Sequence, residues 1–411
     1  MKIFLIPPPA LPIPAVRGGA VETLISHLIE ENERQAKAEL VCVSLPDPEA
    51  QKLAEGYQHT KIHFLPATRP MAQHLWGPVC GQLRRMGRPA PLDPWYEHVR
   101  KLIALEKPDC VVAEGGDLTE PAAIAHQIGR EKMWAHLHMQ LRATQQLEDM
   151  YGGILAISRF VADQWQPTGH CKVRLVPNCV DVARFSPLPE TPEEQSHLRR
   201  MLGYTDEDFV VLYCGRVCEE KGVHRLIEAM VQLDDPHMKL LVVGSPFFAA
   251  EDESPFFERL RREAEPLRQA GRIQFTGYLP NESLPPYYRL ADAACFPAIW
   301  DEPAGIVVIE AMACGCPIVA TASGGMSEYL NGSGALLVSR DETWEAGVCK
   351  PVPGMEPLAD QLAEALRQLK NDPERREKMA QSGPERAKVF SRQAYYENFL
   401  AALQPQPPKA E

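Results

Sequence analysis

Two glutamates with seven residues between them, Glu302 and Glu310, mark the part of the chain best suited to chemistry. They lie in the segment 296–325, which reads FPAIWDEPAGIVVIEAMACGCPIVATASGG. A short apolar run ends at Pro297, and a pattern with helical spacing begins at Gly305. A carboxylate in a loop and another in the first turns of a helix can accept hydrogen bonds from a diol, while the helix N-terminus faces a phosphate. The segment therefore predicts a site for an anion that bears hydroxyl groups.

Earlier in the chain, two cations also follow a predicted strand and precede a predicted helix. Arg216 and Lys221 stand between a predicted strand, residues 209–214, and a predicted helix, residues 223–233. At the carboxyl edge of a parallel sheet, both cations would hold a diphosphate through ionic hydrogen bonds, beside a helix N-terminus. Taken alone, the two residues are explained equally well as solvated surface charges.

The size and charge of the chain limit the classes of protein it can be. A length of 411 residues exceeds the range in which one hydrophobic core keeps growing, so we expect two domains. The 43 basic and 55 acidic side chains give a net charge of −12, which argues against a broad nucleic-acid interface. A local basic pocket for a phosphate remains compatible with that charge.

The cysteines and the N-terminus indicate a cytoplasmic protein. The eleven cysteines are odd in number and fall mainly inside apolar runs, so we expect reduced, buried thiols. Cys314 and Cys316 are separated by one residue, with no second pair at zinc-finger spacing, which argues against a structural metal site. The opening MKIFLIPPP is too short and proline-rich for a secretory signal, and no apolar run approaches ~20 residues. We expect no transmembrane segment, and peripheral membrane contact stays open.

Apolar runs alternate with helical patterns along most of the chain, which predicts mostly parallel, doubly wound sheets. The strand-like runs occupy residues 2–6, 40–44, 62–65, 110–113, 133–139, 154–158, 173–177, 209–214, 239–244, 272–277 and 318–321. The predicted division is an N-terminal domain at 1–185, a polar linker at 186–196, a second domain at 197–388, and a C-terminal segment at 389–411 whose helix packs against the first domain. Two α/β domains in tandem predict a ligand cleft between them.

A glycine pair follows the first predicted strand. Gly18 and Gly19 come before a helix with an apolar stripe, as in many nucleotide-binding units. The loop has neither a G-x-G-x-x-G pattern nor a P-loop lysine, which excludes a dinucleotide or Walker-type site. A tight turn that needs positive φ explains the pair about as well as a ligand contact does.

The order of motifs after residue 209 resembles the donor-binding domain of family-4 glycosyltransferases, the retaining enzymes of GT-B fold. It runs strand-GR-x4-KG-helix, then FTGY at 275–278, then E-P-A-G-(x4)-E, then Gly-Gly at 324–325. The resemblance implies two Rossmann-like domains that face a central cleft. It also implies the roles of the motif residues: Arg216 and Lys221 on the diphosphate of a sugar nucleotide, Glu310 on the ribose, Glu302 on the transferred sugar, the backbone near Ala304, Gly305 and Ile306 on sugar and phosphate, and Tyr278 near the base.

The first half of the chain resembles the same family more loosely. LPIPAVRGGAVETL, which contains Gly18 and Gly19, is similar to the family's glycine-rich first loop, closest to spore-coat-type members. NCVDVARF at 178–185 resembles N-G-V-D-x-x-x-F, with Cys179 in place of the usual glycine. WAHLHM at 134–139 resembles the strand whose terminal histidine approaches the donor sugar, which favours His138 over His136. The family often has an acidic or amide residue next, where this chain has Met139.

The chemistry implied by the resemblance is the departure of a nucleoside diphosphate from an anomeric carbon. Arg216, Lys221 and the helix dipole at Gly305 would stabilise the leaving group. No D-x-D pair stands near a strand end, so we expect metal independence and no cofactor beyond the sugar nucleotide, with a UDP-sugar as the expected donor. The predicted catalytic residues are His138, Glu302, Arg216 and Lys221.

Three questions stay open in the sequence. The acceptor, whether glycan, lipid or small molecule, would be chosen by loops such as the proline-rich segment 66–94. The alternatives to a transferase are a non-catalytic spore-coat or scaffold protein that kept the fold, and a GT-B sugar-nucleotide epimerase. The oligomeric state is undetermined.

Overall fold

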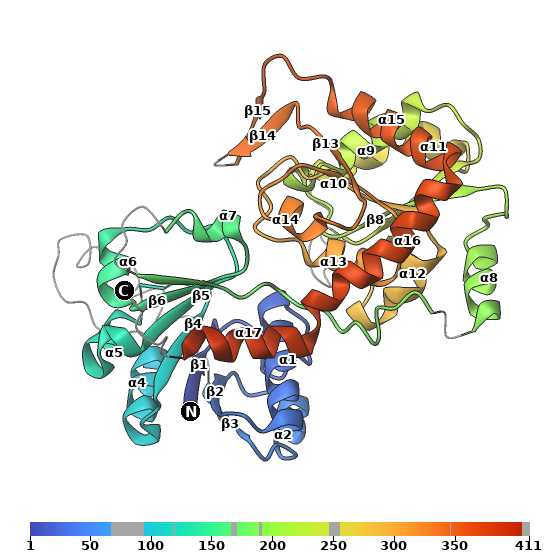
Figure 1. Cartoon of the computed structure of the whole chain (residues 1–411). Helices are drawn as coiled ribbons and strands as arrows, with labels where there is room; N and C mark the ends of the chain where they lie inside the picture. Colours follow the sequence, from blue (N-terminus) through green and yellow to red (C-terminus); the bar gives the residue numbers. More distant parts are fainter. Residues whose placement is uncertain are drawn as a thin grey trace. The chain divides into compact units, whose positions relative to one another are not determined.

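The computed structural model describes residues 1–66, 94–116, 118–119, 121–165, 171–188, 191–245, 255–345 and 347–404. These form two compact units (Figure 1). Unit 1 comprises Met1–Pro177 together with the C-terminal segment from Tyr395, and unit 2 comprises Asn178–Ala394. The division predicted from the sequence ended the first domain at residue 185, where unit 1 ends at Pro177, and the second at residue 388, where unit 2 ends at Ala394.

Unit 1 is built on a seven-stranded sheet in the order β3-β2-β1-β4-β5-β6-β7, and every pairing in it is parallel. Its central strands are continuous apolar runs because both faces of a wound parallel sheet are covered by helices. The strands are β1 (Lys2–Ile6), β2 (Glu39–Ser44), β3 (Thr60–Phe64), β4 (Cys110–Glu114), β5 (Met133–Leu137), β6 (Gly153–Ala156) and β7 (Lys172–Leu175).

Helices connect these strands, as the alternating pattern predicts. They are α1 (Ala20–Gln35), α2 (Pro48–Ala54), α4 (Pro94–Glu106), α5 (Ala122–Ile128), α6 (Gln145–Met150) and α7 (Arg159–Ala162). Helix α1 buries Leu24, Ile25, Leu28 and Ile29, four members of the stripe that its helical spacing brings onto one face.

The last helix, α17 (Arg392–Leu403), supplies unit 1 with side chains from the far end of the chain. The hydroxyl of Tyr396 donates a hydrogen bond of 2.6 Å to Oδ1 of the buried Asn32. Tyr395 and Phe399 lie against the ring of His136, with ring centroids 6.2 and 6.1 Å apart. In Figure 1 the red α17 lies among the blue elements of this unit.

Unit 2 is built on a six-stranded parallel sheet in the order β10-β9-β8-β11-β12-β13, with a separate antiparallel hairpin, β14-β15. The strands are β8 (Phe209–Cys214), β9 (Met238–Val243), β10 (Ile273–Gly277), β11 (Ala293–Phe296), β12 (Ile318–Thr321), β13 (Leu336–Val338), β14 (Glu342–Glu345) and β15 (Val348–Pro351). The helices are α8 (Pro192–Met201), α9 (Val223–Gln232), α10 (Pro255–Glu263), α11 (Glu265–Gln269), α12 (Pro285–Leu290), α13 (Ile306–Ala313), α14 (Met326–Leu330), α15 (Leu358–Asn371) and α16 (Pro373–Ala387).

Each sheet has a point where the direction of strand addition reverses. In unit 1 this point lies between β1 and β4, and in unit 2 between β8 and β11. Ligands of doubly wound folds bind outside the carboxyl ends of the strands at such a point. The segments after β4, β8 and β11 are therefore the first places to look for a site.

Several expectations from the sequence need correction or lie outside the described residues. Helix α8 begins inside the segment 186–196, which is therefore not a structureless linker throughout. The hairpin β14-β15 is an element that the sequence did not predict. The acceptor loop proposed at 66–94 lies almost entirely outside the described residues.

The described cysteines agree with the expectation of reduced thiols. All ten are free, and eight of them are buried, including Cys314 and Cys316. Burial raises the pKa of the Cys214 thiol to about 12, as expected for a side chain that serves packing.

No helix in the described part of the chain is long and apolar enough to cross a bilayer.

Replacing Gly222 with alanine is expected to destabilise unit 2, because a Cβ there would lie 1.9 Å from the carbonyl oxygen of Pro297 at a φ of 70°. Gly203 has a φ of 75° but no atom within 4 Å of its Cβ position, so Gly203→Ala measures the left-handed backbone alone. We expect a loss of about 1 kcal/mol for Gly203→Ala. Gly222→Ala is expected to cost at least about 2 kcal/mol more in urea denaturation. Equal losses would contradict the close approach.

Candidate functional site

The loops after β8 and β11 are joined by backbone contacts at the reversal point of unit 2. Gly222 approaches the carbonyl of Pro297, and the N–H groups of Ile299 and Trp300 donate to the carbonyl oxygen of Glu220 at 3.0 and 3.4 Å. The segment that carries Lys221 is therefore held against the segment that leads to Glu302.

Lys221 and Glu302 form an ion pair at this junction. Nζ of Lys221 lies 2.5 Å from Oε2 of Glu302, and both side chains are mostly buried. The indole N–H of Trp300 donates to the same oxygen at 2.7 Å, and the Lys221 ammonium lies 5.1 Å from the centroid of the Trp300 ring. A cation over an indole face is attracted by the ring quadrupole. Trp300 thus contacts both charged groups, and the sequence had not singled it out.

The backbone of Glu302 is fixed from a third segment. Its N–H donates to Oγ of Ser323 at 2.9 Å, and that hydroxyl donates to the carbonyl of Trp300 at 2.7 Å. A Cβ on Gly324 would lie 2.4 Å from the carbonyl oxygen of Glu302, and the N–H of Gly325 donates to that oxygen at 2.8 Å. The predicted glycine pair therefore serves close backbone packing against Glu302.

Arg216 follows β8 but is more exposed than Lys221. Its side chain is 42% exposed, and its guanidinium lies 3.5 Å from Oε1 of Glu220. The carbonyl of Arg216 accepts a 2.6 Å hydrogen bond from the hydroxyl of Tyr213, which fixes the backbone. Both predicted phosphate-binding cations thus have a carboxylate neighbour.

Glu310 lies on α13 and is buried. Its Oε1 accepts from the side-chain amide of Asn281 at 2.7 Å, and its Oε2 accepts from the hydroxyl of Tyr288 at 2.8 Å. Burial raises the pKa of this carboxyl, and the two hydrogen bonds counteract part of that effect. Each carboxylate oxygen keeps a second lone pair. The predicted contact of Glu310 with a ribose remains a prediction.

The remaining predicted contacts of unit 2 lie around the start of α13 and after β10. Gly305 caps α13 with a φ of 97°, Ala304 is buried, and Ile306 is the first residue of the helix. Tyr278 directly follows β10, and its side chain is 43% exposed. The roles of these residues toward sugar, phosphate and base stay predictions.

The predicted glycine pair of unit 1 forms a turn with the positive φ that its residue type allows. Gly18 and Gly19 have φ values of 78° and 96°, and Gly19 caps α1. The backbone requirement explains both glycines. A ligand contact at this loop stays a prediction.

A buried cluster lies at the carboxyl ends of β4 and β5. Oε2 of Glu114, the last residue of β4, lies 2.8 Å from Nδ1 of His136 and 2.9 Å from Nε2 of His138. Glu114 and His136 are fully buried, and the His138 side chain is 8% exposed. Of the two histidines, His138 is thus the one that reaches the surface of the unit, just past the end of β5. Glu114 was not predicted from the sequence, although it ends an apolar strand beside the reversal point.

The same cluster is where donor atoms suited to a metal gather. Within the described residues, one ligand atom from each of Glu114, His136 and His138 lies within 4.8 Å of the others. In the structure, Nδ1 of His136 and Nε2 of His138 are hydrogen-bonded to the Glu114 carboxylate. The expectation of metal independence is untested.

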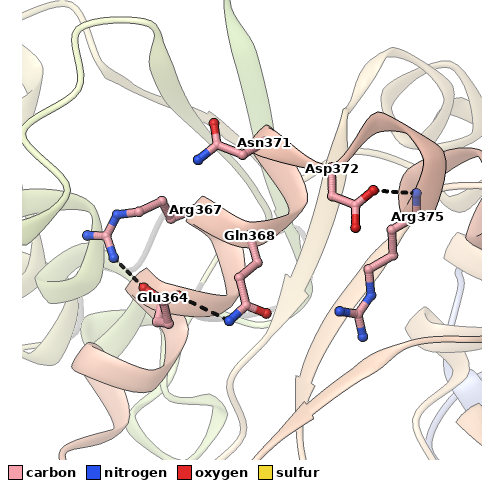
Figure 2. Close-up of a pocket in the computed structure, with 6 residues that line it drawn as sticks. All are labelled: Glu364, Arg367, Gln368, Asn371, Asp372 and Arg375. Carbon is pink, nitrogen blue, oxygen red and sulfur yellow. Dashed lines mark hydrogen bonds and ion pairs between the residues drawn. The ribbon is translucent and has the colours of Figure 1, made fainter.

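An open depression on α15 and α16 is unrelated to these groups. Figure 2 shows the residues that line it: Glu364, Arg367, Gln368, Asn371, Asp372 and Arg375. Asp372 caps α16 by accepting from the N–H of Arg375 at 2.9 Å, and Glu364 bonds to Arg367 and Gln368 along α15. These contacts describe a solvated helix surface.

The hairpin β14-β15 is anchored beside the site. The N–H of Trp344 donates to the carbonyl of Ile299 at 3.1 Å. Glu342 accepts two 2.7 Å hydrogen bonds from Arg225, one at each oxygen. Burial alone would raise the pKa of Glu342, but hydrogen bonds from His224 and Arg225 hold it well below its usual value.

The stability that Glu342 contributes is expected to depend on pH. Because its folded-state pKa is lowered, the contribution is present above the ordinary value near 4.5 and is lost as pH falls below it. Glu342→Gln should therefore cost roughly 1.5–3 kcal/mol at neutral pH and much less at about pH 3. Thermal unfolding of both proteins across this range measures the difference. A difference that does not change with pH would contradict the assignment.

The match to a known family model lies in the second half of the chain. The model of the family described as glycosyl transferases group 1 matches residues 194–386. D-inositol 3-phosphate glycosyltransferase of Corynebacterium jeikeium is 28% identical over 359 residues, which are 86% of this chain and 74% of that protein. Spore coat protein SA of Bacillus subtilis is 23% identical over 418 residues, covering 98% of this chain and 99% of that protein.

The fold is shared with solved structures. The crystal structure of Anabaena HepE in complex with UDP-glucose matches with a TM-score of 0.71 at 19% identity, over 98% of this chain and 99% of that chain. At this identity the likeness concerns the fold alone. The prediction of two Rossmann-like domains with parallel sheets is confirmed.

Proposed function

We propose that the chain is a glycosyltransferase of GT-B fold that transfers a sugar from a UDP-sugar with retention and without a metal ion. The match of the glycosyl transferases group 1 model to residues 194–386 supports this proposal. The observation that carries this proposal is the Lys221–Glu302 pair at the reversal point of unit 2. An ammonium suited to phosphate and a carboxylate suited to sugar hydroxyls lie side by side there.

Lys221 can serve two partners at once. An ammonium has three N–H groups, and one of them is directed to Glu302. The others have no assigned partner within the described residues and can donate to a β-phosphate. Glu302 keeps lone pairs on Oε1 for the hydroxyls of the transferred sugar. The pair would thus orient the β-phosphate and the transferred sugar on either side of the bond that breaks at the anomeric carbon.

The leaving diphosphate needs stabilisation as negative charge develops on it. Lys221 and Arg216 would supply positive charge, and the N-terminus of α13 after Gly305 adds a positive dipole end. Cations in these positions can take the place of a divalent metal, which supports metal independence. UDP is the carrier that the sequence resemblance implies, and the solved complex of HepE, which shares the fold, contains UDP-glucose.

A thermal-shift screen tests the donor. We expect UDP-sugars to raise Tm, and EDTA to leave that rise unchanged, because a ligand that binds only the folded state stabilises it. A larger rise with GDP- or ADP-sugars would refute the base assignment, and a rise that EDTA abolishes would refute metal independence. Product analysis with and without acceptor then separates transfer from epimerisation, and the anomeric configuration of the product tests retention.

Lys221→Ala and Glu310→Ala are expected to weaken donor binding, because each removes a contact to the diphosphate or the ribose. The expected loss is ~2–5 kcal/mol for a buried ionic contact, measured by calorimetry with the donor identified in the screen. Lys388→Ala is a matched control, since Lys388 pairs with Glu385 on an exposed helix end. Donor affinity in the Lys221 variant equal to that of wild type would refute the diphosphate role.

A further inference from the structure

Glu114 is a carboxylate placed where a charge is costly. It is fully buried at the end of β4, and its Oε2 faces two imidazoles. A buried charge costs several kcal/mol unless it is paired or hydrogen-bonded. Burial raises the pKa of Glu114, but attraction to His136 and hydrogen bonds from both histidines outweigh this effect and keep the pKa below its usual value. The carboxylate is therefore ionised and accepts hydrogen bonds only.

This acceptor determines where the histidine protons lie. A carboxylate oxygen can only accept, so Nδ1 of His136 and Nε2 of His138 carry hydrogens. Burial and the neighbouring His136 lower the pKa of His138, which favours its neutral form. Nδ1 of a neutral His138 is then an unprotonated acceptor. This atom has no hydrogen-bond partner within the described residues.

Packing confines both rings around this carboxylate. The His136 and His138 ring centroids are 4.2 Å apart, and His136 is enclosed by Tyr395 and Phe399. Gly115 lies beside the other ring, since a Cβ on it would be 3.5 Å from Cδ2 of His138. The β4 loop thus borders the His138 ring, and Glu114 accepts its hydrogen bond.

We propose that Glu114 is a positioning residue that fixes the tautomer and the orientation of His138 for sugar transfer. The proposal rests on the proposed function, through the role of His138 toward the donor sugar. Glu114 acts through His138 and does not itself touch the substrate.

Two substitutions separate the parts of this role. Glu114→Ala removes the acceptor, whereas Glu114→Gln keeps an oxygen that can accept from both imidazoles and removes the charge. We expect Glu114→Ala to lower kcat about 10-fold or more while donor Kd changes less than about twofold. Glu114→Gln is expected to retain more of kcat. Glu148→Gln is the matched control, because Glu148 is equally buried in unit 1 on α6, and its kcat per folded protein should equal that of wild type.

The imidazole nitrogens report the tautomer directly. In 15N spectra of wild-type protein, His138 should be protonated at Nε2, and in Glu114→Ala a population protonated at Nδ1 should appear. An unchanged tautomer or an unchanged kcat in Glu114→Ala would overturn the proposal. Stoichiometric metal found at the cluster by elemental analysis would also overturn it, since the same nitrogens would then coordinate the metal.

The outcomes distinguish this proposal from the proposed function. If wild-type protein transfers sugar from no nucleotide donor, the proposed function fails, while the spectra still test whether Glu114 orients His138. If wild type is active and Glu114→Ala is equally active, only the positioning role fails.

Discussion

The approach of Gly222 to the carbonyl of Pro297 determines how the two loops at the reversal point of unit 2 are placed. A Cβ at that position would lie 1.9 Å from a backbone oxygen, and φ is left-handed, so the position requires glycine. The approach sets Lys221 against Glu302, a residue 81 positions later. Trp300 then contacts both groups, and Ser323 holds the backbone from which Glu302 projects. The geometry of the candidate site thus follows from backbone packing more than from the attraction of the charges.

The amino-acid sequence predicts features that depend on neighbouring residues in the chain better than it predicts contacts between separate elements. The strands β1, β8 and β12 lie at the bounds that the apolar runs predict, because strands covered on both faces must be apolar throughout. Strand ends in turn place Arg216, Lys221 and Glu302 at one sheet edge. The partners of Glu310 and Glu114, and the contact of Trp300 with Lys221, depend on residues of other elements and had no signal in any motif. The hairpin β14-β15 was missed because its strands are short and Glu342 is their only buried residue.

The carboxylate neighbours of Arg216 and Lys221 offset part of the positive charge that the motif implies. Lys221 faces Glu302 at 2.5 Å, and Arg216 lies near Glu220 at 3.5 Å. The first pair is mostly buried and rigidly supported, so it orders the ammonium before a ligand arrives. The second is exposed, where ion pairs contribute little, so the guanidinium can leave its carboxylate at small cost. The two cations of one motif therefore have different physical properties: one is held in position and the other can adjust.

The return of α17 to unit 1 gives the chain a particular order of synthesis. Unit 2 is complete once Ala394 has been made, whereas unit 1 lacks the rings of Tyr395 and Phe399 until the final helix follows. Domains emerging from the ribosome commonly fold in N-to-C order. Here the N-terminal unit is finished last, and a chain truncated before α17 would leave one face of His136 uncovered. The histidine cluster, although its residues come early in the chain, depends on the translation of α17 to be fully covered.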